Sequence, residues 1–268
     1  MKLLHTLKRS LALWAAPLLT ALGLSSCIDG KAVVTLAPDG SGTIAASIST
    51  TAPARAFMKQ QKQNPEDQMP KESDLKDAAA KMGEGFSVKK VEPIKEGDEI
   101  IGYTVEYAFK DITKLNLGPN PKEQKLHLSF APGALGLTLD LPVEVKEDKA
   151  EAPKEDKAED PQEAMQQQMM MAMFKPMLAG GKIKLSVKAG AKISKSNATY
   201  VDGNEMTLIE VNLDDALADP KLADVLKAVS GAQKKEPTPG EVLKLINKLK
   251  QLKGIKIETN PKIDLNFE

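Results

Sequence analysis

The sequence predicts an α+β fold, in which an antiparallel sheet built from hairpins has one face covered by amphipathic helices. Apolar and polar residues alternate in several short segments, which is typical of strands with one buried face. Turn-forming residues separate neighbouring segments at hairpin spacings. The helical segments group between the hairpins and do not alternate one by one with strands, which favours α+β over alternating α/β.

The first half of the chain contains two clear hairpin signals. The turn at 38–42 (PDGSG) is dense in residues that tolerate turn geometry, and the turn at 95–98 (KEGD) separates two alternating segments. The expected elements are, in order, strand 33–36, strand 43–49, helix 54–63, helix 73–82, strand 86–94 and strand 99–109.

The second half adds strands, a tight turn at 202–203 (DG) and helices with recognisable end signals. Asp160, Pro161 and Glu163 form a capping pattern before one helix. Pro239 at a helix start and Gly254 at its stop bound another. The expected elements are strand 126–130, strand 135–145, helix 162–178, strand 183–187, strand 206–213, helix 220–229, helix 239–252 and strand 263–267.

The N-terminal segment is predicted to be an export signal and not part of the folded domain. Lys2, Lys8 and Arg9 precede an apolar run that is too short to span a bilayer comfortably, and small residues follow it. Leu24-Ser25-Ser26-Cys27 then resembles the lipobox of bacterial lipoproteins, and Cys27 is the only cysteine in the chain. That resemblance implies cleavage before Cys27 and acylation of its thiol and new amino group.

Three regions follow from this interpretation. Residues 1–26 form the signal peptide, and 27–145 plus 162–268 form a single α+β extracytoplasmic domain. Residues 146–161 repeat KEDKAEAP as KEDKAEDP and contain no large apolar residue, so they are expected to be a flexible charged linker. Ile28 follows the cysteine where Asp would favour inner-membrane retention in the familiar sorting pattern, which favours the outer membrane.

Composition argues against several functions. Without the signal peptide, the chain carries 34 basic and 37 acidic residues. This near balance argues against a general nucleic-acid-binding protein, in which basic residues would be in excess. His127, the one histidine left, lies on the polar side of an alternating strand and is expected to be an ordinary surface residue. No spacing typical of a zinc or EF-hand site and no phosphate-binding loop occurs, so we expect no catalytic residue, metal or cofactor.

A methionine cluster is the candidate for ligand binding. We favour packing against the sheet, with a hydrophobic groove for a lipid or peptide as the second interpretation and Cu(I) binding as the third. The groove would be lined by Met165, Met169, Met170, Met173, Phe174 and Met177.

The helix at 239–252 has an apolar stripe and a basic side with Lys244, Lys248 and Lys250. Such a helix on a tethered protein could rest on anionic lipid. Packing on the sheet with a solvated basic side is the favoured interpretation.

Two segments also resemble the LppM-type lipoprotein domain. One is VVTLAPDGSG (33–42), and the other runs from Lys182 to Leu213 and contains SNA and a DG turn. The resemblance implies an exported, membrane-tethered α+β domain with a hydrophobic or lipid ligand, and it carries over no catalytic residues.

The function expected from the sequence is therefore that of a non-enzymatic, lipid-anchored envelope lipoprotein whose specific role the sequence does not name, with a hydrophobic or lipid molecule as the candidate ligand. The alternative is an envelope scaffold that contacts another protein.

Overall fold

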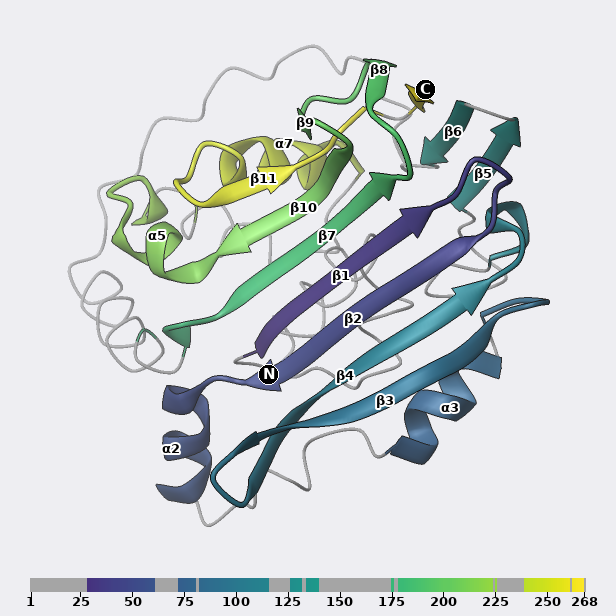
Figure 1. The fold of residues 1–268 in the computed structure, drawn as a ribbon. Coiled ribbons are helices and arrows are strands. Elements are labelled where there is room, and N and C mark those ends of the chain that lie inside the picture. The colour runs from purple at the N-terminus through teal and green to yellow at the C-terminus, as the bar shows by residue number, and fades with distance from the viewer. Residues whose placement is uncertain are drawn as a thin grey trace, which may run out of the picture.

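The computed structural model describes residues 28–60, 72–80, 82–115, 126–131, 134–139, 175, 178–223, 225, 239–260 and 262–267. Two sheets make up half of this part of the chain (Figure 1). The larger sheet has eight strands, seven of them in the order β11-β10-β7-β1-β2-β4-β3, with β9 paired to β10. The smaller has four strands in the order β5-β6-β12-β8, so the fold is α+β with strands in the majority.

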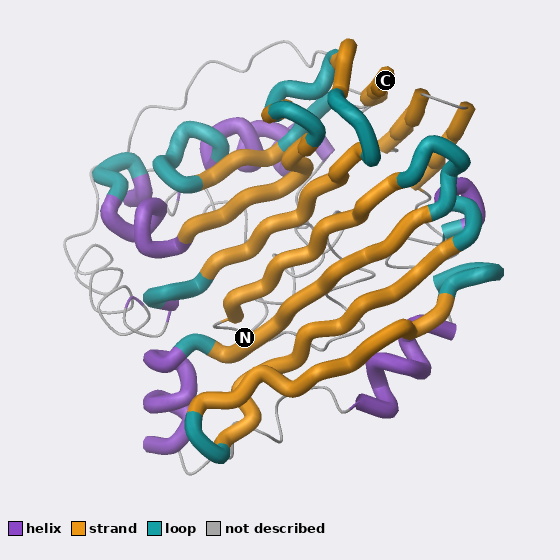
Figure 2. The backbone as a smooth tube through the Cα atoms, viewed as in Figure 1, coloured by secondary structure: helices purple, strands orange, loops and turns teal. Residues whose placement is uncertain are grey.

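Strands of the large sheet run side by side, and many loops gather at the ends of the strands (Figure 2). Its strands are β1 (Ile28–Leu36), β2 (Gly42–Thr50), β3 (Ser87–Glu96), β4 (Glu99–Phe109), β7 (Lys182–Ala189), β9 (Val201–Asp202), β10 (Glu205–Asn212) and β11 (Ile255–Ile257).

The small sheet lies near the end of the large sheet where β1 finishes (Figure 1). It consists of β5 (Leu126–Ala131), β6 (Ala134–Leu139), β8 (Ile193–Ser196) and β12 (Lys262–Phe267). The helices are α2 (Ala52–Gln60), α3 (Glu72–Ala80), α5 (Leu213–Ala218), α7 (Pro239–Leu249) and the 3-10 helix η2 (Ile112–Lys114).

The three predicted turns are confirmed as hairpin connections. They join β1 to β2, β3 to β4 and β9 to β10 in antiparallel pairs. Asp39 stabilises the first turn by accepting hydrogen bonds from the Ser41 N–H (2.9 Å) and hydroxyl (2.6 Å). Gly97 and Gly203 sit in the other two turns with φ of 63° and 60°, which glycine adopts without steric cost.

The large sheet is mixed, which differs from the expected antiparallel sheet. Strand β1 pairs with β7 in parallel, with Ala32 opposite Leu185 and Val34 opposite Val187. Parallel strands need a long crossover connection. Here the two strands are separated by most of the chain's first two thirds, so no hairpin signal could reveal the pairing.

Two further differences concern element ends near α5 and α7. The segment expected as one strand to Leu213 ends at Asn212, whose side-chain oxygen accepts the Asp214 N–H and begins α5. Helix α7 ends at Leu249, and Gly254 (φ 72°) then leads into β11, a three-residue strand that the sequence did not reveal. The short length of β11 leaves too few alternating positions to signal a strand.

One buried cluster contains residues of both sheets. Alternation places Val34, Ile44 and Tyr107 on the same side of neighbouring strands in the large sheet. Leu75 and Ala79 of α3 belong to the same cluster. The small sheet contributes Leu135, Ile193, Ile263, Leu265 and Phe267.

Glycine allows the two sheets to approach at the β1–β2 turn. A side chain at Gly40 would lie 2.8 Å from the Phe130 ring of β5, and Gly40 has a φ of 86°. The Gly40 carbonyl also accepts the Ile112 N–H of η2 (3.0 Å). These contacts fix the small sheet beside this end of the large one.

Candidate functional site

Strand β1 starts at Ile28, directly after Cys27, and lies inside the large sheet between β2 and β7. Ile28 is opposite Thr50, the last residue of β2, and Asp29 is opposite Lys182, the first residue of β7. We call the end of the large sheet at which β1 begins the Ile28 end. The other end of the strands, which holds the Asp39 turn, is called the Asp39 end.

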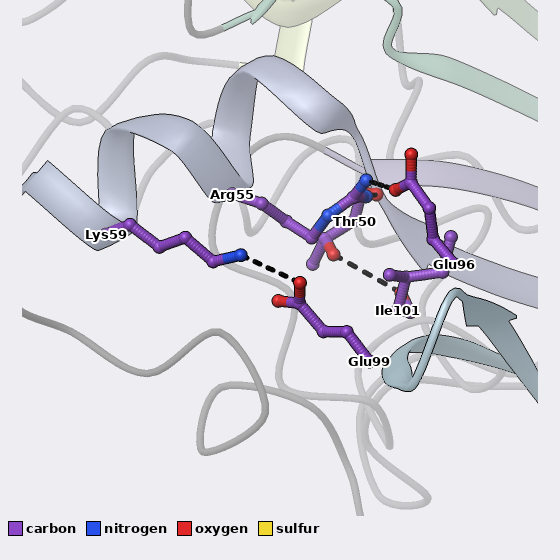
Figure 3. A network of polar contacts seen from close by, with 6 residues as sticks. All are labelled: Thr50, Arg55, Lys59, Glu96, Glu99 and Ile101. Atoms are coloured by element: carbon purple, nitrogen blue, oxygen red, sulfur yellow. Dashed lines mark hydrogen bonds and ion pairs between the residues drawn. The ribbon is translucent and has the colours of Figure 1, made fainter.

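Helix α2 is held at the Ile28 end by a polar network with the β3–β4 hairpin (Figure 3). The Arg55 guanidinium donates to the Thr50 carbonyl oxygen and forms an ion pair with Glu96. The Arg55 side chain is 8% exposed and that of Glu96 is 63% exposed. Arginine suits this position because its planar group can donate in two directions at once.

A second ion pair fastens the next turn of α2 to the same hairpin. Lys59 Nζ lies 2.7 Å from Glu99 Oε2. Lys59 is four residues after Arg55, so both cations lie on one side of the helix. The Thr50 hydroxyl also donates to the Ile101 carbonyl oxygen at 3.3 Å, which links the start of α2 to β4.

The exposed side of α2 adjoins its cations and includes Lys59. Ala52, Pro53, Ala56 and Gln60 are exposed there, whereas Ala54 is buried. The helix contains no acidic residue. At about 100° per residue, Ala52 and Ala56 lie within about 60° of Lys59, so the exposed side of α2 includes a cation, and the ion pair of that cation with Glu99 ties this side to the hairpin.

Arg55→Ala should loosen α2 and leave the rest of the sheet intact. The substitution removes a buried charged donor, which is worth about 1.5–3 kcal/mol per hydrogen bond. We expect faster amide hydrogen exchange in α2 than in the wild-type protein, while β1 and β7 keep their protection.

Lys59→Ala is the matched control, because exposed ion pairs contribute only about 0–1 kcal/mol. Its side chain is 57% exposed. Equal exchange in the two variants would show that Arg55 does not hold the helix.

A second polar cluster surrounds Glu258, which follows β11 and is fully buried. Its carboxylate accepts the backbone N–H groups of Thr199, Thr259 (2.9 Å) and Asn260 (3.0 Å). The Thr199 hydroxyl donates a further bond of 3.0 Å. These donors satisfy the hydrogen-bonding capacity of the buried carboxylate. We therefore interpret the cluster as structural: it joins the β8–β9 connection to the β11–β12 connection, and we call it the Glu258 joint.

Asn197 extends this joint. Its side chain donates to the Lys262 carbonyl oxygen (2.9 Å) and accepts the Asp264 N–H (2.8 Å). Asn260 donates to the Asn197 carbonyl oxygen (2.7 Å). The Asn197 side chain is thus occupied in holding β12 beside β8.

Asp219 joins α5 to the segment after α7. Its carboxylate accepts the N–H of Lys221 (2.9 Å) and that of Lys253 (2.8 Å). These two backbone bonds lower the pKa of Asp219 below its usual 3.8. The carboxylate therefore stabilises the fold above the unfolded-state pKa, and this contribution is lost as the pH falls toward the lower folded-state pKa.

In Asp219→Asn, the free energy of unfolding is expected to fall less steeply at acid pH than it does in the wild-type protein. The neutral amide cannot lose charge, so the stability difference between wild type and variant should shrink as the pH falls below 3.8. Urea unfolding between neutral and acid pH measures this. A difference that stays constant with pH would contradict the role of the carboxylate charge.

The part of the chain that the structure describes holds neither a metal cluster nor a membrane-spanning helix. No three His, Cys, Asp or Glu side chains there gather closely enough to hold a metal ion. None of the helices described is both long and apolar enough to cross a membrane.

No protein-family model matches the chain, and no curated protein matches it. The chain is similar to the folded domain of LppM from Mycobacterium tuberculosis, solved by NMR. The match covers 70% of this chain and 85% of the LppM domain, with 14% sequence identity and a TM-score of 0.31. LppM is the protein whose domain type residues 33–42 and 182–213 resemble.

Among the predicted site residues, the three lysines are described. Lys244 and Lys248 are exposed on α7. Lys250 is half-buried just after the helix, and its Nζ donates to Thr259 Oγ1 at 2.9 Å. Lys250 therefore contributes to the joint around Glu258, and the structure separates it from the other two.

The remaining predicted residues lie outside the described part. This holds for Cys27, for linker 146–161, and for the side chain of His127, whose backbone lies in β5 opposite Thr138. Of the methionine-rich segment, Lys175 and Leu178 are described, and Lys175 is exposed. The groove residues outside the description are Met165, Met169, Met170, Met173, Phe174 and Met177.

Sequence reasoning missed Arg55 and Glu258. A signal for Arg55 existed, because it is the only arginine after the predicted signal peptide and stands in an otherwise apolar turn (APARAF). Glu258 carried no such signal, since a glutamate after a short apolar segment resembles any surface glutamate.

Proposed function

We propose that this chain is a non-enzymatic lipoprotein of the bacterial cell envelope, exported by residues 1–26 and held by lipid on Cys27. The observation that supports this most is the position of β1, which starts at Ile28 in the interior of the large sheet. Ile28 and Asp29 are already paired with Thr50 and Lys182, so a lipid on Cys27 would adjoin a strand that is paired on both sides.

The finer proposals concern location and architecture. The outer membrane is favoured because Ile28 follows Cys27 where a retained protein would carry Asp. The amphipathic helices, α7 among them, cover one face of the sheet. Two or more acyl chains would keep the mature chain attached to the bilayer, whereas a single chain binds only marginally. Each CH₂ group that is buried in the bilayer contributes about 0.8 kcal/mol.

Cys27→Ser tests the anchor. We expect the variant to lose labelling by a fatty-acid analogue, to remain uncut before residue 27 and to accumulate as precursor. Adding Thr104→Cys to this variant is the control, because Thr104 is exposed on β4 and supplies a thiol away from the lipobox. Wild-type processing of Cys27→Ser, or labelling restored by Thr104→Cys, would overturn the proposal.

For the ligand, we propose a hydrophobic or lipid molecule held by the methionine-rich segment, whose thioethers form a deformable apolar wall. Native mass spectrometry of protein extracted from its host should show a bound lipid. Changing Met169 and Met173 to glutamine should remove that lipid while the circular dichroism spectrum stays the same. A protein isolated without any bound lipid would contradict this role.

A further inference from the structure

We infer that lipid attachment and removal of the signal peptide take place before β1 is enclosed between β2 and β7, because the closed sheet hides the chain beside Cys27. This inference rests on the proposed function for export and lipid attachment. It adds an order of events: the two reactions at Cys27 come first, and the pairing of β1 with β7 follows.

Both reactions involve the residue next to β1. In the first, the Cys27 thiol displaces the phosphorylated headgroup of a phospholipid: a carbon–sulfur bond to the diacylglyceryl group forms, a carbon–oxygen bond breaks, and the thiol proton leaves with the headgroup. In the second, water hydrolyses the peptide bond between Ser26 and Cys27, which gives a carboxylate on Ser26 and an amino group on Cys27. Consecutive Cα atoms are about 3.8 Å apart, so this peptide bond lies within about 8 Å of Ile28.

The start of β1 has a neighbouring strand on each side (Figure 1). Ile28 is paired with Thr50 of β2, and Asp29 is paired with Lys182 of β7. Gly30, the next residue, is buried. In an interior strand, the N–H and C=O groups of successive residues bond to the strands on the two sides. The backbone of this segment is therefore already used within the sheet.

An enzyme that acts at Cys27 needs the same backbone groups. Proteins that bind an extended peptide commonly do so through its main-chain N–H and C=O groups, as an added strand does. An enzyme that holds the residues after Cys27 in this way competes with β2 and β7 for Asp29 and Gly30. Freeing these two residues in the folded protein requires opening the sheet on both sides of β1 at the Ile28 end. The folded protein is therefore a poor substrate for both reactions.

The order of the strands along the chain provides the time in which the reactions can occur. Strand β2 follows β1 after a short turn, so these two strands can pair early. A two-stranded hairpin on its own is marginally stable in water. Strand β7 begins only at Lys182, and pairing between segments so distant in sequence forms slowly. The start of β1 therefore stays accessible until β7 has been exported.

Strand β7 ends this period because it turns β1 into an interior strand. The two strands run parallel from the Ile28 end to the Asp39 end, from the Asp29–Lys182 pair to the Leu36–Ala189 pair. Leu36 and Ala189 both belong to the buried cluster that the two sheets share. Opening the start of β1 after this point disturbs a strand that the core holds along its length.

The experiment follows the reactions of the full-length precursor with membranes from a bacterium that processes lipoproteins. The folded precursor is compared with the same protein diluted from urea at the start of the reaction. A second folded precursor carries Gly-Ser-Gly-Ser inserted between Cys27 and Ile28, which moves the reacting bonds away from β1. The insertion variant with Cys27→Ser is the negative control, and an established lipoprotein precursor is the positive control.

Mass spectrometry of the N-terminal peptide measures both the diacylglyceryl group and the cut, and circular dichroism checks that the insertion variant is folded. We expect the folded precursor to react several-fold more slowly than the urea-diluted chain and several-fold more slowly than the folded insertion variant. The Cys27→Ser form should remain uncut.

The outcomes separate the order of events from the proposed function. If the positive control reacts but no form of this chain gains the lipid, or if Cys27→Ser is cut, the proposed function fails. Folded precursor that reacts as fast as the urea-diluted chain would overturn the order alone. If both folded precursors are slow and the urea-diluted chain is fast, the bulk of the domain blocks the enzymes and the pairing of β1 does not, which also overturns the inference.

Discussion

Glu258→Ala should be among the most destabilising substitutions in the described part of the chain. It removes the acceptor for three backbone N–H groups and the Thr199 hydroxyl. Each buried donor left without an acceptor costs about 1–3 kcal/mol. Thr199 is exposed, so water replaces part of what is lost there. We expect the free energy of unfolding to fall by about 3 kcal/mol in urea titrations.

Glu258→Gln is the matched control, since it keeps the shape of the side chain and one carbonyl acceptor. Its amide group would face N–H groups that also donate, so we expect a loss smaller than that of Glu258→Ala but still measurable. An alanine variant within about 0.5 kcal/mol of wild type would contradict the structural role of the carboxylate.

Leu265→Ala should destabilise both sheets together. Leu265 lies in β12 of the small sheet, is 1% exposed and belongs to the same buried cluster as Ile44 of the large sheet. Truncating a buried leucine leaves a cavity and costs about 2–5 kcal/mol. Because the cluster is shared, we expect one cooperative unfolding transition shifted to lower urea concentration, with the fluorescence of tyrosines in β4 following it.

Asn266→Ala is the control on the same strand. Asn266 is exposed, and its neighbour Ser194 bonds its backbone carbonyl rather than its side chain. We expect a change within about 0.5 kcal/mol. Two separate transitions in Leu265→Ala, with the small sheet unfolding first, would show that the sheets do not share one core.

The predictable features of the fold are those that short segments determine. The Asp39, Gly97 and Gly203 turns were predictable because a turn depends on a few adjacent residues. The parallel pairing of β1 with β7 was not, since Ala32 and Leu185 are brought together only by the whole intervening chain. The switch from β10 to α5 at Asn212 was also hidden, because a single capping residue separates strand residues from a six-residue helix.

In the candidate site, too, local features were predictable from the sequence and long-range contacts were not. The lipobox around Cys27 is a local pattern and is readable without a structure. The clamp on α2 joins Arg55 to Glu96 across 41 positions of sequence, and neither residue indicates its partner. The three lysines were grouped because one predicted helix carried them, but Lys250 lies after the end of α7 and its contact with Thr259 sets it apart from Lys244 and Lys248.

The mass of the N-terminal peptide from protein extracted out of native membranes tests the central claim most directly. The account predicts a chain that begins at Cys27, with a diacylglyceryl group on the thiol and Ile28 as the second residue. An N-terminus upstream of residue 27, or an unmodified Cys27 in membrane-bound protein, would contradict it.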